Sequence, residues 1–224
     1  MVAKLLKIQA RTDFVDEVYG ALVNAICDGS LAPGVRITQE EIADQLAVSR
    51  SPVLQALRLL KKDGLIKDAP GRGVLVAPLG EDSLAHIYQI RGSIDSLAAR
   101  LAAQRRAVLN PALIERGRHS SHDGDVHAMI DADIAFHFAV YAASGNPLIA
   151  ETARVHWVHL RRVMGAMLQV AGQRASIWEE HASIARAIAE GNVKIAMELS
   201  EFHTARAFEH LRTGLQDVIS TVHS

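Results

Sequence analysis

Four side chains in the second half of the sequence have the types and spacing of a metal site. Asp133 and His137 stand four residues apart in the segment D-A-D-I-A-F-H, so a helix would place both on one face. The apolar stripe of that helix consists of Val126, Ile130, Ile134 and Tyr141. Asp133 and His137 fall within or beside this stripe, where a carboxylate is costly unless it is paired or bound to a cation.

Two further histidines occupy similar positions. His181 lies between apolar residues of its own helix, and His203 lies at the edge of the apolar stripe of the last predicted helix. With Asp133 and His137 they supply one carboxylate and three imidazoles from three helices. This set suits a divalent ion such as Zn²⁺, Ni²⁺, Mn²⁺ or Fe²⁺, with zinc as the first choice. The residues alone leave an alternative open, namely a hydrogen-bonded Asp–His pair with unrelated core histidines.

A bundle of helices has to position these groups. From Asp82 onward the apolar periodicity is helical. The breaks fall at Asn110-Pro111, Asp123-Gly124, Gly145-Asn146-Pro147, Gly172 and Gly191-Asn192. They predict about six helices in an antiparallel bundle without a sheet.

The first part of the chain is organised differently. Helices are predicted over 13–28, 38–46 and 49–63, and Thr38 with Glu41 forms a capping box at the start of the second. Segments 65–68 and 74–77 flank P-G-R-G and predict a small hairpin. Three helices and a hairpin predict a winged helix-turn-helix. The expected fold is therefore mainly α, with a DNA-binding domain over 8–78 and an all-helical domain over 79–224.

The third helix of such a motif lies in the major groove, and the wing approaches the backbone. The exposed face of this third helix includes two arginines and two lysines. The candidate DNA contacts are Thr38, Ser49, Arg50, Ser51, Arg58 and, at the wing tip, Arg72. The alternative is a small helical domain that makes protein contacts, with its basic residues merely solvated.

Composition excludes several classes of protein. The 224 residues include 24 Lys and Arg, 25 Asp and Glu and one Cys, and hydrophobic residues make up 49%. Disordered and collagen-like chains are excluded, and a net charge of −1 gives no global attraction to nucleic acid. One cysteine cannot form an internal disulfide, and no apolar run reaches the roughly 18 residues of a membrane-spanning helix. We therefore expect a cytoplasmic protein.

The N-terminal motif resembles the GntR-type winged-helix transcription regulators. The resemblance covers residues 15–80 and includes L-A-P-G-V-R-I-T-Q-E-E-I-A-D-Q-L-A-V-S-R-S-P-V-L-Q-A-L-R-L-L-K-K-D-G-L-I and the wing G-R-G-V-L-V-A-P-L. It implies a homodimer that binds a short pseudo-palindromic operator. Glu40 and Leu54 stand where the family usually has arginine, while Arg50 is retained. Losing two cations should weaken phosphate attraction and shift the base preference.

Residues 84–210 resemble the FCD effector domain of the FadR-type branch of these regulators. The motifs are Y-Q-I-R-G-S-I-D-S-L-A-A-R-L-A-A, D-I-A-F-H, S-G-N-P-L-I, H-A-S-I-A-R-A-I-A-E-G-N and E-F-H. The resemblance implies that Asp133, His137, His181 and His203 bind the ion and that the effector is a small organic acid. Arg91 matches the family arginine and is the first candidate to hold that acid. Arg161 either reaches the same cavity or is a solvated or interface residue.

These expectations combine into a metal-containing, carboxylate-responsive transcription regulator, with repression as the expected outcome. The main alternative is a metal-dependent hydrolase or lyase that uses the same four residues. It would need a general base, and the sequence places no further carboxylate clearly on an inward stripe. A third hypothesis is that the ion is a structural staple, which stabilises the fold and takes no part in effector binding.

Overall fold

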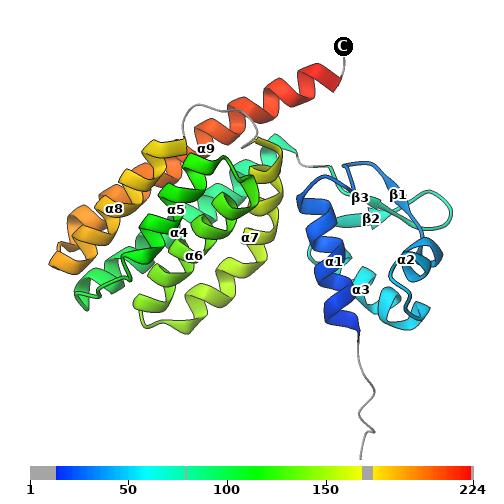
Figure 1. Cartoon of the computed structure of the whole chain (residues 1–224), viewed down its shortest axis with the longest axis horizontal. Coiled ribbons are helices and arrows are strands. Elements are labelled where there is room, and N and C mark those ends of the chain that lie inside the picture. Colours follow the sequence, from blue (N-terminus) through cyan, green and yellow to red (C-terminus); the bar gives the residue numbers. More distant parts are fainter. Residues whose placement is uncertain (1–13, 79, 168–173, 223–224) are drawn as a thin grey trace, which may run out of the picture. The chain divides into compact units, whose positions relative to one another are not determined.

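The computed structural model describes residues 14–78, 80–167 and 174–222 (Figure 1). Within them the chain forms two compact units, one of residues 14–26 and 31–77 and the other of residues 27–30 and 78–222. In this part of the chain no helix combines the length and the apolar character that crossing a bilayer would require.

The first unit is a winged helix-turn-helix. Helices α1 (Val15–Cys27), α2 (Gln39–Gln45) and α3 (Arg50–Lys62) enclose an apolar core. The fully buried members of that core come from α3, the segment after it and the last strand; they are Val53, Ala56, Leu60, Leu65 and Val76. The predicted capping box is confirmed, because the Thr38 side chain accepts from the Glu41 backbone and Glu41 accepts from the Thr38 backbone. Ser49 has N-cap backbone geometry but makes no side-chain cap.

The wing has one strand more than the predicted hairpin. Strands β1 (Arg36–Ile37), β2 (Ile66–Asp68) and β3 (Val74–Val76) form an antiparallel sheet in the order β1-β3-β2. Two residues are too few for an alternating pattern, which explains why β1 was not predicted. Gly73 has a φ of +90°, and a Cβ there would lie 2.6 Å from the Ile37 carbonyl oxygen. The tight wing tip beside β1 therefore depends on this glycine.

The second unit is an all-helical bundle, which confirms the predicted mainly α fold class. Its helices are α4 (Glu81–Gln104), α5 (Ala112–Asp123), α6 (Val126–Ala143), α7 (Pro147–Met167), α8 (Arg174–Glu190) and α9 (Val193–Val222). The breaks at Asn110-Pro111, Asp123-Gly124, Gly145-Asn146-Pro147 and Gly191-Asn192 fall between these helices as predicted, whereas the break at Gly172 lies outside the described residues.

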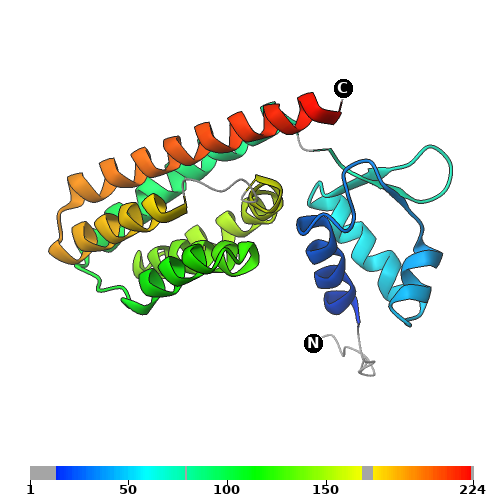
Figure 2. The same cartoon turned by 45° about the horizontal axis from the view of Figure 1, so that its top comes forward.

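Small residues let the long helices α4 and α9 run side by side (Figure 2). On α4 the residues Ala98, Ala99, Ala102 and Ala103 are all buried, and on α9 so is Ala196. A helix whose buried face is alanine can approach its neighbours closely, which brings polar side chains within reach of one another inside the bundle. Two buried charged residues of α4 precede these alanines, Asp95 by about one turn and Arg91 by about two.

The contact between α5 and α8 gives a stability prediction. A Cβ at Gly117 would lie 2.0 Å from the Trp178 ring, so Gly117→Ala forces the two helices apart and is expected to destabilise the protein by about 1–3 kcal/mol. Chemical denaturation measures this. The matched control is Gly92→Ala on α4, where the nearest atom would lie at 3.6 Å and helix propensity favours alanine by about 0.5–1 kcal/mol. Equal effects of the two changes would contradict the packing described.

Candidate metal centre and nucleic-acid interface

Asp133 and His137 on α6, His181 on α8 and His203 on α9 converge inside the bundle. One ligand atom from each lies within 4.8 Å of all the others, and all four residues are buried. His181 Nε2 lies 3.5 Å from Asp133 Oδ1 and 3.3 Å from His203 Nε2, and His137 Nε2 lies 3.9 Å from Asp133 Oδ1. Each Nε2 therefore faces the same small space as the carboxylate.

Carboxylates stand behind two of the three imidazoles. His203 Nδ1 lies 2.9 Å from Glu180 Oε2, and Glu180 also accepts from Arg206. His137 Nδ1 lies 3.5 Å from Asp95 Oδ2. A carboxylate at Nδ1 keeps the proton on that nitrogen and leaves the Nε2 lone pair available, which is the usual arrangement around a metal-binding histidine.

His181 has a different environment. It is completely buried, its ring stacks on Phe136 at 4.1 Å between centroids, and Trp178 lies against its edge. Its Nδ1 atom has no hydrogen-bond partner among the described residues. A buried nitrogen without a partner costs about 1–3 kcal/mol. Apolar packing fixes this ring with Nε2 toward Asp133 and His203, so its placement serves the cluster rather than local hydrogen bonding.

Burial dominates the electrostatics of the cluster. It raises the pKa of Asp133 above its usual range, although Arg91 and His203 act in the opposite direction. It also holds the pKa of His137 and of His181 well below the usual value, and nearby cationic groups add to this effect. Both rings are therefore neutral, which is the form in which an imidazole ligates a metal.

These observations support a fit between the four residues and a divalent ion. Donor atoms held at about 2.1 Å from a tetrahedral zinc ion lie roughly 3.4 Å apart. Among the six donor pairs, two separations of 3.3 and 3.5 Å agree with that spacing, one is 3.9 Å, and the others lie within 4.8 Å. One carboxylate with three imidazoles is also a donor set that zinc, nickel, manganese and iron accept.

Arg91, a predicted effector contact, lies against the cluster. Its guanidinium contacts His137 Nε2 at 2.8 Å, Asp95 at 3.2 Å and the Tyr88 hydroxyl at 3.2 Å, and it lies over the Trp157 ring. The gap beside it has no room for a water molecule and is lined by Ile94, Tyr141, Ala153, His156, Trp157 and Leu160. Ligand pockets usually start near 300 Å³, so an acid would need side-chain movement to enter.

Arg161, the other predicted effector contact, is not part of this arrangement. It forms an ion pair with Asp131 at 3.5 Å and is partly exposed. It does not line the gap beside Arg91.

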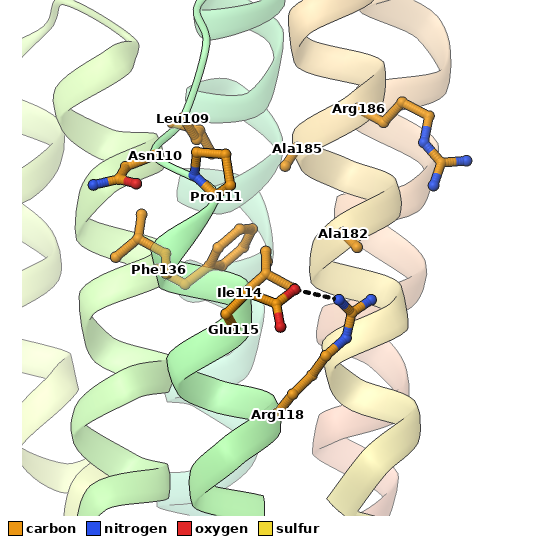
Figure 3. Close-up of a pocket in the computed structure, with 11 residues that line it drawn as sticks. Leu109, Asn110, Pro111, Ile114, Glu115, Arg118, Phe136, Ala182, Ala185 and Arg186 are labelled. Atoms are coloured by element: carbon orange, nitrogen blue, oxygen red, sulfur yellow. Dashed lines mark hydrogen bonds and ion pairs between the residues drawn. The ribbon is translucent and has the colours of Figure 1, made fainter.

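A larger hollow lies between α5 and α8 and is lined by Ile114, Phe136 and Ala182 among others (Figure 3). Its volume is about 300 Å³. Arg118 at its rim is paired with Glu115 and Glu179, and Arg186 points away from the hollow. Its charged groups are thus either neutralised or turned outward, so it does not offer a cation to an acid.

Sequence reasoning missed two inward carboxylates. Asp95 is 3% exposed and accepts hydrogen bonds from Tyr141 and Arg91, and Glu180 is largely buried behind His203. The expectation that no further carboxylate faces the centre was therefore wrong. Glu180 directly precedes His181 but contacts a histidine of another helix, which residue spacing within α8 cannot indicate.

The predicted DNA contacts lie on the surface of the winged helix-turn-helix. Ser49, Arg50, Ser51, Arg58 and Arg72 are exposed, and Thr38 is half-buried as the cap of α2. The first turn of α3 is tied to α2, because the Gln39 amide donates to the Arg50 carbonyl. Arg36 was not predicted; its guanidinium donates to the Arg72 carbonyl and orients the wing tip.

Glu40 forms an ion pair with Arg50 at 3.0 Å. Both side chains are exposed, with fractions of 60% and 67%. The carboxylate at this position therefore competes directly with a phosphate for the guanidinium of Arg50.

Two families match this chain. The family described as "FCD domain" matches residues 86–206, more than half of the chain, and the family described as "Bacterial regulatory proteins, gntR family" matches residues 14–76. An uncharacterized HTH-type transcriptional regulator of Streptomyces ambofaciens is 28% identical over 200 residues, which cover 87% of this chain and 84% of that protein.

A probable D-xylose utilization operon transcriptional repressor of Paenarthrobacter nicotinovorans is 27% identical over 198 residues, which cover 87% of each protein. Among solved structures, Escherichia coli McbR/YncC has a TM-score of 0.77 at 21% identity, with coverage of 91% of this chain and 99% of that one. This structural likeness shows a shared fold.

Proposed function

This chain belongs to the GntR family of bacterial regulators and carries an FCD domain, and we propose that it is a metal-containing repressor that responds to a small carboxylic acid. The family consists of DNA-binding transcription regulators and not of enzymes. The hydrolase or lyase hypothesis is accordingly dropped. We further propose that residues 8–78 bind the operator, that residues 79–224 hold the ion and the effector and form a homodimer, and that the protein acts in the cytoplasm.

One observation carries the proposal. Four ligand atoms from three helices lie within 4.8 Å of one another inside an apolar core. Without a bound ion, this arrangement confines a carboxylate and three imidazoles where water cannot solvate them, and Arg91 is the cation that contacts them. The carboxylates at Nδ1 of His203 and His137 add support, since they keep the proton on Nδ1 and leave the Nε2 lone pair of each ring available to a ligand.

The roles of the residues follow from their chemistry. Asp133, His137, His181 and His203 would hold a divalent ion, zinc as the first choice, which when bound supplies an electrophilic centre for a carboxylate oxygen. Arg91 would hold the same acid through charge-assisted hydrogen bonds, and Arg161 would do so only after leaving Asp131. Ligand binding would shift the population between dimer geometries whose recognition helices do or do not match the operator.

A titration tests this proposal. A duplex selected by the protein from a random-sequence pool is labelled, and its affinity is measured by fluorescence anisotropy with small acids and with a chelator. We expect at least one acid, or removal of the ion, to change the affinity. Unchanged affinity under every condition would leave a DNA-binding protein without a sensor. A chelator that lowers only thermal stability would instead favour the structural-staple hypothesis.

The Glu40–Arg50 pair gives a prediction for DNA binding. Glu40→Gln removes the competing carboxylate, so Arg50 is free to neutralise about one more phosphate. Affinity for the duplex is expected to rise, and the slope of log affinity against log salt to steepen by about 0.9. The control Glu17→Gln on α1 removes the same charge away from Arg50. Parallel salt slopes for Glu40→Gln and the unmodified protein would contradict this role of Glu40.

A further inference from the structure

The ligating nitrogen of His137 already has a partner in the chain. Arg91 Nη2 lies 2.8 Å from His137 Nε2. A guanidinium can only donate, so the imidazole must accept through its Nε2 lone pair while Nδ1 carries the proton toward Asp95. The same lone pair is the one that His137 would use as a ligand. Arg91 and a divalent ion therefore compete for one pair of electrons.

The other groups of the Arg91 guanidinium are held by contacts that do not involve His137. Its Nε donates to Asp95 at 3.2 Å, its Nη1 donates to Tyr88 at 3.2 Å, and the plane lies over Trp157 at 4.4 Å. These contacts hold the stem and one edge of the guanidinium. The remaining nitrogen, Nη2, contacts His137. A small displacement of Nη2 can exchange this partner for another while the contacts with Asp95, Tyr88 and Trp157 persist.

Charge adds to this competition. The guanidinium remains protonated in proteins and lies beside the four candidate ligands, so it repels a dication. At the same time it compensates Asp95 and Asp133, two buried carboxylates of the same interior. The positive charge that a metal would supply is thus partly supplied by the chain itself.

From this geometry we infer that Arg91 couples acid binding to metal binding. Arg91 must give up His137 Nε2 before that nitrogen can ligate, and a carboxylate gives Nη2 an anionic partner in exchange. Each ligand therefore strengthens the binding of the other, and the effector acts by controlling occupancy of the metal centre. This inference rests on the proposed function and specifies how its two ligands regulate each other.

Zinc affinity tests the coupling without any DNA readout. The full-length protein is stripped with a chelator, and Zn²⁺ affinity is measured by competition with a chromophoric chelator, with and without acetate. Saturating acetate is expected to raise the affinity about 5–150-fold, the usual range for coupled sites. In Arg91→Met we expect tighter zinc binding than in the unmodified protein without acetate, and a much smaller effect of acetate, since only the contact between the acid and the ion remains. Arg154→Met, which removes an exposed cation of α7, should behave as the unmodified protein.

The outcomes separate the two proposals. If the unmodified protein binds no zinc, the proposed function fails and the coupling with it. If it binds zinc but Arg91→Met keeps the full acetate effect, or binds zinc more weakly without acetate, only the coupling is overturned.

Because Arg91 is buried, its replacement could prevent folding, and circular dichroism detects this. In that case the affinity for acetate is measured in the unmodified protein, with and without zinc. Acetate must bind the zinc-loaded form more tightly than the zinc-free form, by the same factor by which acetate raises the zinc affinity. Equal acetate affinities for the two forms would overturn the inference.

Discussion

Replacing Asp133 with asparagine is expected to abolish tight binding of a divalent ion. The change keeps the shape of the side chain but removes the one carboxylate among the four ligands, and no imidazole can supply a negative charge in its place. The loss of zinc affinity should exceed about 10–100-fold, which is the loss typical for replacing a residue that only hydrogen-bonds to a ligand. Competition with a chromophoric chelator measures the affinity of the two proteins under identical conditions.

The metal-free form provides a separate prediction for the same variant. Burial raises the pKa of Asp133 in the folded state, so the folded protein holds a proton more tightly than the unfolded chain does. The ionised carboxylate therefore lowers stability at neutral pH, and this penalty disappears as the pH falls below the unfolded value. In the presence of a chelator, the free energy of unfolding of Asp133→Asn is expected to equal or exceed that of the unmodified protein.

With zinc added, the unmodified protein should become more stable than Asp133→Asn. Zinc at about 100 times its Kd stabilises a protein that binds it by about 2.7 kcal/mol, and it should leave Asp133→Asn unchanged. The control is His127→Ala on the same helix, where the side chain is exposed. Equal stabilisation of Asp133→Asn and the control by zinc would show that Asp133 is not a ligand.

Glu180→Gln is expected to weaken metal binding about 10–100-fold while the fold is retained. Burial alone would raise the pKa of Glu180, but the hydrogen bonds from His203 and Arg206 lower it, so the group is a carboxylate. It accepts from His203 Nδ1 at 2.9 Å and thereby keeps Nε2 unprotonated and aimed at the cluster. A glutamine can also donate, so it no longer selects that tautomer.

The neighbouring residue offers a matched control for this experiment. Glu179 is exposed and pairs with Arg118 on α5, away from the imidazoles. Glu179→Gln makes the same chemical change one position earlier and should leave zinc affinity unchanged. Since surface ion pairs contribute roughly 0–1 kcal/mol, its effect on stability is also expected to be small. Equal zinc affinities of the Glu179 and Glu180 variants would contradict a role for the carboxylate behind His203.

The sequence predicted those features that a single element encodes. The four-residue spacing of Asp133 and His137 indicates that they share one face of α6, and both are buried. The predicted apolar stripe was correct only in part, because Ile130 and Tyr141 are buried whereas Val126 and Ile134 are half-buried. The Thr38–Glu41 capping box is also local, because both partners lie within one turn. Helix ends at Gly124, Gly145 and Gly191 follow from their positive φ, which glycine adopts without strain.

Contacts between elements could not be predicted in the same way. Asp95 meets His137 and Tyr141 across α4 and α6, and Glu180 meets His203 across α8 and α9. Periodicity reports the face of one helix but not which residue of another helix stands opposite. The Glu40–Arg50 pair likewise spans the turn between α2 and α3, and its identity depends on how that turn is closed.

The most direct test is the metal content of the protein purified without metal-affinity resin and without chelators. Elemental analysis of the unmodified chain and of Asp133→Asn, prepared side by side, gives the number of transition-metal ions per chain. The cluster predicts about one ion per chain in the unmodified protein and a loss of that ion in the variant. If the two proteins carry the same amount of metal, the four convergent side chains do not form a metal centre.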